Sequence, residues 1–267
     1  MTALLDGKGA LGDPAEFFGR EGDAETSSDM LAGRNPPTDV LRSNFIPTLV
    51  NTGEQLVLFD TGRGGDNGDL LRQIEAAGYS ADQVDLVVMS HMHPDHIGGL
   101  LTGGEPTFPN ATYTVGSTEY DFFSNTDLVG SPAERIHNFV TANVAPFVEK
   151  ARFIAPGESV APGIEVFKAF GHTPGHLAFH LESEGQRLVL TADTANHFVL
   201  ALARPDLAFA YDFDAEAAST TRREILGMIA ADKVPFLGYH MPFPGIGYLT
   251  AQGDGFLYEP MSYQLES

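Results

Sequence analysis

The chain has 267 residues, with 15 basic and 36 acidic side chains, a formal net charge of −21 at pH 7 and no cysteine. Its length predicts one large domain or two small ones with a sizeable core, and its ordinary apolar content excludes a mainly disordered chain. The acidic charge disfavours nucleic acid as a partner, and the lack of cysteine excludes disulfides, thiolate metal ligands and a cysteine nucleophile.

The ends of the chain and its hydropathy bear on localisation. No apolar run is long enough to span a membrane, and the N-terminus lacks the basic head and apolar stretch of a signal peptide. We therefore expect a soluble protein with no membrane partner, cytoplasmic as it stands and periplasmic or secreted if an upstream signal has been removed. Whether two copies of the chain form a homodimer stays open. Residues 19–39 are polar and rich in Gly and Pro, which predicts a surface loop within a single domain over 1–267.

Regular patterns begin at residue 44. Residues 44–50 and 55–60 flank an NTGE turn and predict a hairpin, and apolar positions at helical spacing predict a helix over 69–78. The apolar run over 84–90 is typical of a strand buried on both faces. The remaining patterns predict strands over 112–116, 164–170, 177–183, 186–193 and 234–239, and helices over 117–123, 132–150 and 214–231. This alternation predicts an α/β fold.

A dense group of metal-binding side chains follows the apolar run. His91, His93, Asp95 and His96 lie within six residues, directly after the predicted buried strand. Neutral imidazole and carboxylate suit Zn, Fe or Mn, and the lack of sulfur disfavours Cu(I) and iron–sulfur clusters. The alternative is a surface histidine tract, which would not be expected to follow a buried strand. The segment therefore predicts a metal site.

Three further candidates stand where predicted strands end. His172 lies in GHTPGH after 164–170, Asp193 ends 186–193, and His240 follows 234–239. Taken singly, each has an ordinary explanation, such as a capping carboxylate or a hydrogen-bonded core histidine. Taken together, strand ends that meet at one rim predict a joint site, and two metal ions about 3.5–4 Å apart with a shared carboxylate would use all of these groups.

The sequence resembles the metallo-β-lactamase superfamily. Five features carry the resemblance and occur in that family's order: Asp60 after LVLF, HxHxDH from His91 to His96, His172 in GHTPGH, Asp193 after LVLTA, and His240 near the end. The resemblance covers residues 44–249 and implies an αββα sandwich with a dinuclear metal site at its edge. It implies the following ligands: His91, His93 and His172 for one metal, Asp95, His96 and His240 for the other, and Asp193 as the bridge.

One branch of the superfamily is most similar. GHTPGHLAFHLES, the stretch from TADTANH to AYDFDAE, and GYHMPFPGIGY resemble methyl parathion hydrolase and related lactone and organophosphate hydrolases. The opening TALLDG resembles an early strand of that branch. Members usually carry another strand before it, so we expect that the N-terminal edge strand is missing or lies upstream of Met1.

The resemblance implies a dinuclear metal-dependent hydrolase. A hydroxide that bridges the metals would open lactones or cleave esters, with phosphotriesters as promiscuous substrates, so the partner is a small molecule. Asp193 and Asp95 are the candidate catalytic carboxylates, and Asp60 would support a ligand imidazole from behind, although closing its own turn is the alternative. Zinc is the favoured metal, and Mn, Fe or Co suit the same donors.

Two other activities stay open. A persulfide dioxygenase of the superfamily uses one iron on a similar scaffold, and a β-lactamase without a cysteine ligand is compatible with the donor set. Substrate contacts are predicted from position alone: Asn196 and His197 follow Asp193 closely. The aromatic side chains Phe17, Phe18 and Tyr239 are the candidate apolar lining, with ordinary core packing as the alternative.

Overall fold

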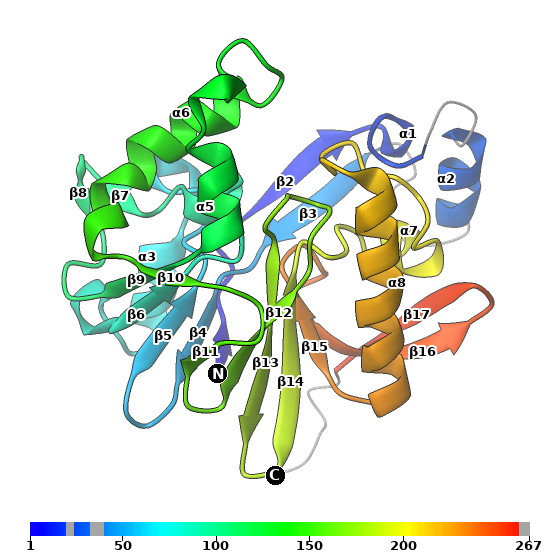
Figure 1. Cartoon of the computed structure of the whole chain (residues 1–267). Helices are drawn as coiled ribbons and strands as arrows, with labels where there is room; N and C mark the ends of the chain where they lie inside the picture. The colour runs from blue at the N-terminus through cyan, green and yellow to red at the C-terminus, as the bar shows by residue number, and fades with distance from the viewer. Residues whose placement is uncertain (20–23, 33–39, 262–267) are drawn as a thin grey trace.

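Two β-sheets face each other, and helices cover their outer faces in this computed structural model, which describes residues 1–19, 24–32 and 40–261 (Figure 1). The six-stranded sheet has the order β1 (Thr2–Ala3), β4 (Thr48–Asn51), β5 (Leu56–Phe59), β6 (Leu86–Val88), β9 (Thr112–Gly116), β10 (Arg152–Ile154). The seven-stranded sheet has the order β11 (Ser159–Ala161), β12 (Ile164–Lys168), β13 (Leu177–Ser183), β14 (Gln186–Ala192), β15 (Phe236–Gly238), β16 (Ile246–Gln252), β17 (Gly255–Pro260). Both sheets are mixed, with parallel pairing from β5 to β10 and between β14 and β15.

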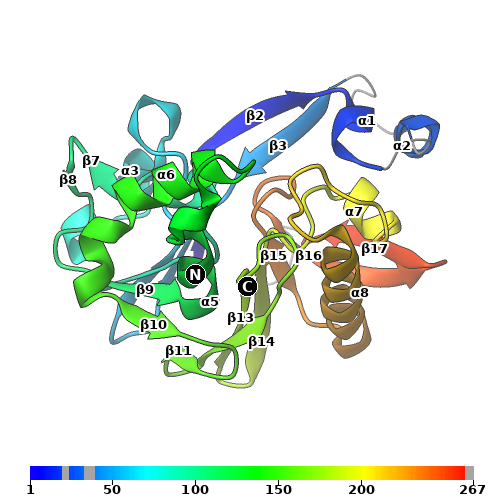
Figure 2. The ribbon, with the colours of Figure 1, turned by 45° about the horizontal axis from the view of Figure 1, so that its top comes forward.

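The α-helices are α1 (Pro14–Phe17), α2 (Ala24–Leu31), α3 (Leu70–Ala76), α4 (Pro94–Ile97), α5 (Ser117–Phe123), α6 (Glu134–Asn143), α7 (Leu200–Ala203) and α8 (Ala215–Asp232). The helices α3, α5 and α6 lie outside one sheet and α7 and α8 outside the other, whereas a separate hairpin runs across the top of the sandwich and ends at α1 and α2 (Figure 2). Short 3-10 helices are η1 (Gly65–Asn67), η2 (Ala81–Gln83), η3 (Thr126–Leu128) and η4 (Ala145–Lys150). The separate hairpin is β2 (Gly7–Gly12) with β3 (Leu41–Phe45), and a small one joins β7 (Leu101–Thr102) to β8 (Glu105–Pro106).

Three apolar layers hold this sandwich together. Phe59 and Val88 of one sheet meet Phe179 and Leu190 of the other in the central layer, where the Phe59 and Phe179 rings are 4.9 Å apart. A second layer packs α3, α5 and α6 on the six-stranded sheet, and a third packs α7 and α8 on the seven-stranded sheet. The αββα order expected from the resemblance is confirmed.

Three predicted elements differ in detail. The predicted strand over 44–50 is divided between β3 and β4 around Pro47, which has no N–H to donate to a ladder. The predicted helix over 132–150 becomes α6 and then η4, which begins beside Pro146. The predicted loop over 19–39 contains α2, whose Leu31 is buried; its residues 20–23 and 33–39 lie outside the described part of the chain.

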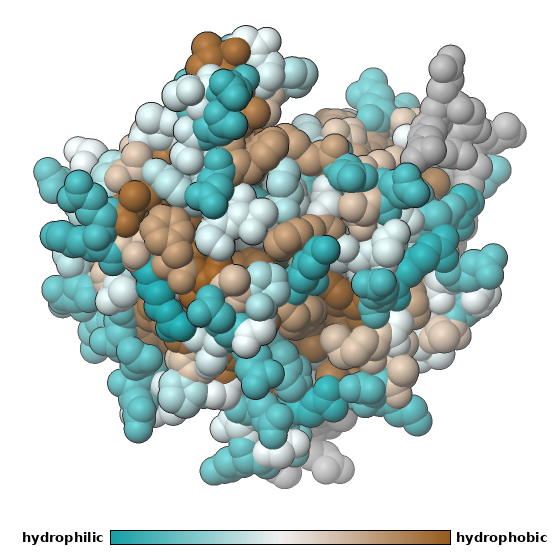
Figure 3. All heavy atoms as spheres, in the orientation of Figure 1, coloured by the Kyte–Doolittle hydropathy of each residue, from teal (hydrophilic) through white to brown (hydrophobic). Residues whose placement is uncertain are grey.

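The N-terminal segment forms part of the sandwich. β1 pairs antiparallel with β4 and is the edge strand of the six-stranded sheet, so this sheet has an N-terminal edge strand, of two residues. Within the described ranges, no helix is long and apolar enough to cross a bilayer. Hydrophilic side chains cover most of the rim of the face in Figure 3, and hydrophobic ones show toward its middle.

Candidate metal centre

The seven candidate ligands meet at one end of the two sheets. The chain leaves β6 into the loop that carries His91 and His93, and α4 follows with Asp95 and His96. His172 follows β12, Asp193 directly follows β14, and His240 follows β15. Side chains that follow strands of both sheets therefore converge at one end of the sandwich, as the strand-end pattern predicted.

The first cluster consists of His91, His93, His172 and Asp193, all of them buried. His93 Nδ1 lies 3.1 Å from His91 Nε2 and 3.0 Å from His172 Nε2. Asp193 Oδ2 lies 3.3 Å from His172 Nε2 and 3.9 Å from His91 Nε2. Three imidazole nitrogens and one carboxylate oxygen thus surround a common point, which is a donor set typical of Zn²⁺ or a similar divalent ion.

The second cluster consists of Asp95, His96 and His240. Asp95 Oδ2 lies 3.7 Å from His96 Nε2 and 3.6 Å from His240 Nε2. Asp193 also reaches this cluster, with Oδ1 3.1 Å from His96 Nε2 and Oδ2 3.0 Å from His240 Nε2. One carboxylate therefore lies between both clusters, in a position from which its two oxygens can serve two ions.

The protonation and hydrogen bonding of these groups fit metal ions. His96 Nε2 and Asp193 Oδ1 are buried, yet within the described part of the chain neither makes a hydrogen bond. Such orphaned polar atoms are costly unless an ion or water satisfies them. Burial, reinforced by neighbouring imidazoles, holds the pKa of His91 and of His93 well below the usual value, so both rings are neutral and free to coordinate.

Negative charge around Asp193 favours cations. Burial lowers the pKa of His96, but the carboxylates led by Asp193 outweigh it and raise that pKa well above its usual value. Hydrogen bonds to Asp193 and Asp212 likewise outweigh burial and raise the pKa of His172 to about 9. Without an ion, both rings would be protonated, and a divalent cation would displace these protons when it binds.

Polar partners orient the rings of His96 and His240 at the nitrogen that points away from the clusters. His96 Nδ1 lies 2.8 Å from Asp60 Oδ2, and Asp60 Oδ1 accepts from Ser90 N at 2.8 Å. His240 Nδ1 lies 2.8 Å from Ser43 Oγ and 2.8 Å from the Asn44 carbonyl. Such contacts fix the tautomer and orientation of a ligand imidazole. Asp60 is thus placed for the supporting role expected from the resemblance.

Glu119 links two of the ligand loops and was not found from the sequence. Its buried carboxylate accepts from Met92 N at 2.9 Å and from Gly175 N at 2.8 Å, one backbone group in each loop. Gly175 has to be glycine, because a Cβ there would collide with the Glu119 backbone. Burial raises the pKa of Glu119 to about 7. Its only sequence signal is its position just after a predicted strand.

A buried ion pair supports the first cluster from α8. Asp212 Oδ1 lies 3.0 Å from His172 Nδ1, and Asp212 Oδ2 lies 3.1 Å from Arg222 Nη2. Arg222 is fully buried and also donates to the carbonyl of Thr194 at 2.8 Å, beside Asp193. The sequence signal for this residue is an arginine among apolar positions of the helix, at the spacing of Ala218, Ile225 and Ile229.

The predicted substrate contacts lie in different surroundings. Asn196 is buried and donates to Asp193 Oδ2 at 2.9 Å. His197 is buried, and its Nδ1 accepts from Val199 N and Leu200 N at the start of α7. Substrate contact by either residue remains a prediction.

The predicted aromatic lining needs one correction. Phe18 has no exposed surface and packs 4.8 Å from the Phe209 ring, so it belongs to the core. Phe17 is partly buried, and its ring lies 5.9 Å from that of Tyr211. Tyr239 is buried, lies against His96 with ring centroids 3.9 Å apart and donates to the Asp95 carbonyl at 2.6 Å. An aromatic that the sequence did not single out is Phe213, which is 39% exposed, with its ring 6.1 Å from that of His93.

Comparisons with known proteins agree with this geometry. Residues 47–238 match the family profile of the Metallo-beta-lactamase superfamily. The chain therefore belongs to the metallo-β-lactamase superfamily, and among its members it groups with metal-dependent hydrolases of the lactonase type.

Three similar proteins define that grouping. The dizinc quorum-quenching lactonase AidC, solved with a product, N-hexanoyl-L-homoserine, superposes with a TM-score of 0.91 at 27% identity, over 98% of this chain and 94% of AidC. The hydrolase AbOPH, described as a beta lactamase superfamily member, superposes with a TM-score of 0.88 at 27% identity, over 98% of this chain and 94% of AbOPH. An N-acyl homoserine lactonase of Bacillus thuringiensis is 25% identical over 167 residues, which are 62% of this chain and 60% of that relative's length.

Proposed function

We propose that this protein is a dinuclear, zinc-dependent lactone and ester hydrolase, with N-acyl homoserine lactones as the first substrates to test. The observation that carries the proposal is the position of Asp193, whose carboxylate lies within 3.3 Å of ring nitrogens in both clusters. A site for one ion does not need this arrangement. When bound, a pair of divalent ions supplies a water nucleophile that is deprotonated near neutral pH and polarises the carbonyl under attack.

The side chains have separate roles in this proposal. His91, His93 and His172 would hold one ion, Asp95, His96 and His240 the other, and Asp193 both. Asp60 and Asp212 contact Nδ1 of His96 and His172, and they would hold these rings so that the Nε2 atoms are available to the ions. Positional precision of this kind lowers the barrier, because the reacting groups need no rearrangement after substrate binds.

Apolar surface on both sides of the cluster fits a substrate with an apolar part. Phe213 stands beside His93, and Phe198 and Tyr258 lie beyond His240. Phosphotriesters are proposed as slower side substrates, since the same nucleophile attacks a phosphoryl centre. The complete second cluster argues against the mononuclear dioxygenase alternative, which would leave Asp95, His96 and His240 without an ion.

The test is acid release at constant pH from zinc-loaded protein. The panel contains N-hexanoyl homoserine lactone, an aryl ester, a phosphotriester and a β-lactam, because each hydrolysis releases a proton. Turnover of the lactone and the ester well above the other two is the expected result. Preference for the β-lactam, or no acid release from any substrate with two zinc ions bound, would refute the proposal.

A further inference from the structure

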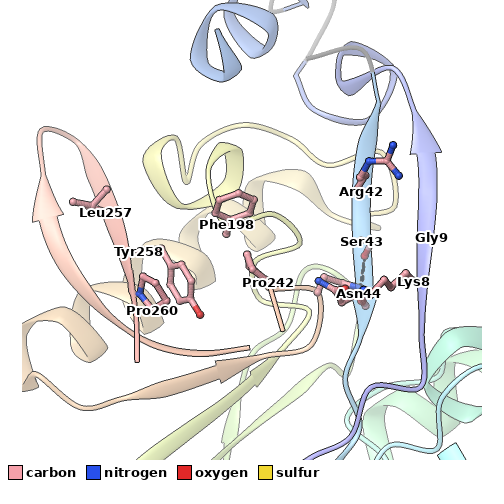
Figure 4. Close-up of a pocket in the computed structure, with 11 residues that line it drawn as sticks. Lys8, Gly9, Arg42, Ser43, Asn44, Phe198, Pro242, Leu257, Tyr258 and Pro260 are labelled. Carbon is pink, nitrogen blue, oxygen red and sulfur yellow. Dashed lines mark hydrogen bonds between the residues drawn. The ribbon is translucent and has the colours of Figure 1, made fainter. Parts of the chain in front are cut away.

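A cavity of about 740 Å³ opens beside His240, between the β2–β3 hairpin and the β16–β17 hairpin. Figure 4 shows Lys8 and Arg42 on the β2–β3 side, with Phe198, Leu257 and Tyr258 across from them. This size is in the range of small-molecule pockets. The cavity is thus apolar on one wall and cationic on the other, and it adjoins the candidate metal centre at His240.

The cationic wall is a built feature of the hairpin. Lys8 pairs in register with Asn44, and Ala10 pairs with Arg42. Side chains directly opposite each other share a face, and so do positions two apart along a strand, so Lys8 and Arg42 lie on one face as diagonal neighbours. Diagonal neighbours are about 7–8 Å apart, a separation at which two positive charges repel and one anion can contact both.

Neither cation is neutralised by the protein. Within the described residues, Lys8 and Arg42 have no ion-pair or hydrogen-bond partner, whereas the exposed Arg72, Arg187 and Arg204 each pair with an aspartate. The chain as a whole carries 36 acidic residues against 15 basic ones. None of the residues that line the cavity is acidic. The cavity is therefore a local region of positive charge on a strongly acidic protein, which favours an anion there.

The hairpin sets the distance between this charge and the metal centre. The Asn44 carbonyl lies 2.8 Å from His240 Nδ1, and Arg42 is two residues further along β3. Two residues of strand span about 7 Å. A short acyl chain that starts at the metal centre would run along Phe198 and Tyr258 and bring its far end to the two cations.

We infer that the cavity binds the acyl portion of the substrate and that Lys8 and Arg42 bind an anionic group at its far end. The preferred substrates are then lactones or esters whose acyl chain ends in a carboxylate, such as half-esters of dicarboxylic acids. This inference rests on the proposed function, because it assigns the substrate class of the same metal centre. It adds a preference among substrates, because the neutral acyl chain of N-hexanoyl homoserine lactone has no anionic group for Lys8 and Arg42 to bind.

The test compares two aryl esters that differ only at the far end of the acyl chain. 4-Nitrophenyl hexanoate and 4-nitrophenyl adipate have acyl chains of equal length, and both release a coloured phenolate. With zinc-loaded full-length protein at low salt, we expect kcat/KM to favour the adipate ester about fivefold to tenfold, mainly through KM, as two exposed charge pairs would give. The preference should shrink as salt screens the charges.

Two double variants separate the cavity from overall charge. Lys8→Gln with Arg42→Gln should abolish the preference for the adipate ester. The matched control, Arg135→Gln with Lys150→Gln, removes the same charge from exposed positions in α6 and η4, and it should keep the preference. Free adipate should also bind wild type more tightly than hexanoate in calorimetry, and this advantage should disappear only in the cavity variant.

The possible failures are distinguishable. Equal turnover of the two esters by wild type, or a preference that survives Lys8→Gln with Arg42→Gln, would overturn the inference and leave the proposed function intact. Loss of the preference in both double variants would also overturn it, because overall charge would then be the cause. Refusal of both esters and of lactones would refute the proposed function together with this inference.

Discussion

Replacing Arg222 with methionine tests how the buried polar framework supports the metal centre. Arg222 Nη2 lies 3.1 Å from Asp212 Oδ2, and the same guanidinium donates to the carbonyls of Thr194, Pro205 and Leu207 at 2.8, 3.0 and 3.0 Å. The change removes the guanidinium from the buried Asp212 carboxylate, which keeps only the His172 ring as a charged neighbour, and it leaves three carbonyls without this donor. Removing one partner of a buried ion pair costs about 3–5 kcal/mol, a large share of the stability of a typical domain.

The assay is urea unfolding of the metal-free protein, with Arg223→Met as the control. Arg223 is the next residue, its side chain is 47% exposed, and it pairs with Asp206 only at 3.6 Å. An exposed pair of this kind contributes at most about 1 kcal/mol. We expect Arg222→Met to lower the free energy of unfolding by about 3–5 kcal/mol and Arg223→Met by less than about 1 kcal/mol.

A second substitution shows whether the buried charge is the cause. Adding Asp212→Asn to Arg222→Met should recover part of the loss, because the variant then no longer buries a carboxylate that has lost its guanidinium partner. Equal stability of Arg222→Met and Arg223→Met would contradict the support assigned to this ion pair. A loss in the double variant that equals the sum of the losses in Arg222→Met and in Asp212→Asn would contradict it as well.

Three other predictions concern the ligands and their surroundings. Asp193→Ala should lose the shared carboxylate and most activity while keeping its circular dichroism spectrum; wild-type turnover in this variant would exclude the dinuclear mechanism. Asp60→Ala should weaken zinc retention about 10–100-fold in a competition with a chelator, and unchanged affinity would reduce Asp60 to closing its turn. Burial lowers the pKa of His197 to about 4, below its unfolded value, so the contribution of this residue to the stability of the metal-free protein, about 3 kcal/mol, should be lost as pH falls from about 6.5 to 4, and His197→Gln should lose about that much less than wild type. Equal acid losses in the two proteins would contradict the last prediction.

The positions of the candidate ligands followed from local sequence patterns. His91 and His93 come directly after a strand that the apolar run made recognisable, and Asp193 and His240 come after two others. Their shared position after strand ends predicted a joint site, although the fold shows that β6 belongs to one sheet and β14 and β15 to the other, so the packing of the two sheets brings the residues together. The assignment of two ions with a shared carboxylate came from the same convergence together with the resemblance.

The supporting residues could not be found in this way, because they depend on tertiary packing. Arg222 is a polar residue on the otherwise apolar face of α8. Only the fold reveals that Asp212 and the Thr194 carbonyl accept its hydrogen bonds. Glu119 reaches Met92 and a second loop only because α5 lies beneath both. A capping or buried carboxylate has no periodic signature, whereas strands and amphipathic helices do.

The same limit applies to the walls of the site. Phe18 was expected near a substrate, but tight contacts with Phe209 and His197 place it in the core. The cavity beside His240 joins strands that are far apart in sequence, β3 and β17, so neither hairpin alone indicates it. Contacts of this kind are set by the packing of whole elements, and local sequence patterns do not determine them.

The most direct measurement is the rate of N-hexanoyl homoserine lactone hydrolysis as zinc is added stepwise to metal-free protein. Both clusters contain a complete donor set and share Asp193, so we predict that activity rises until about two zinc ions are bound per chain and then stays constant. Full lactone hydrolysis at one zinc ion per chain, or no hydrolysis at two, would contradict a dinuclear lactonase.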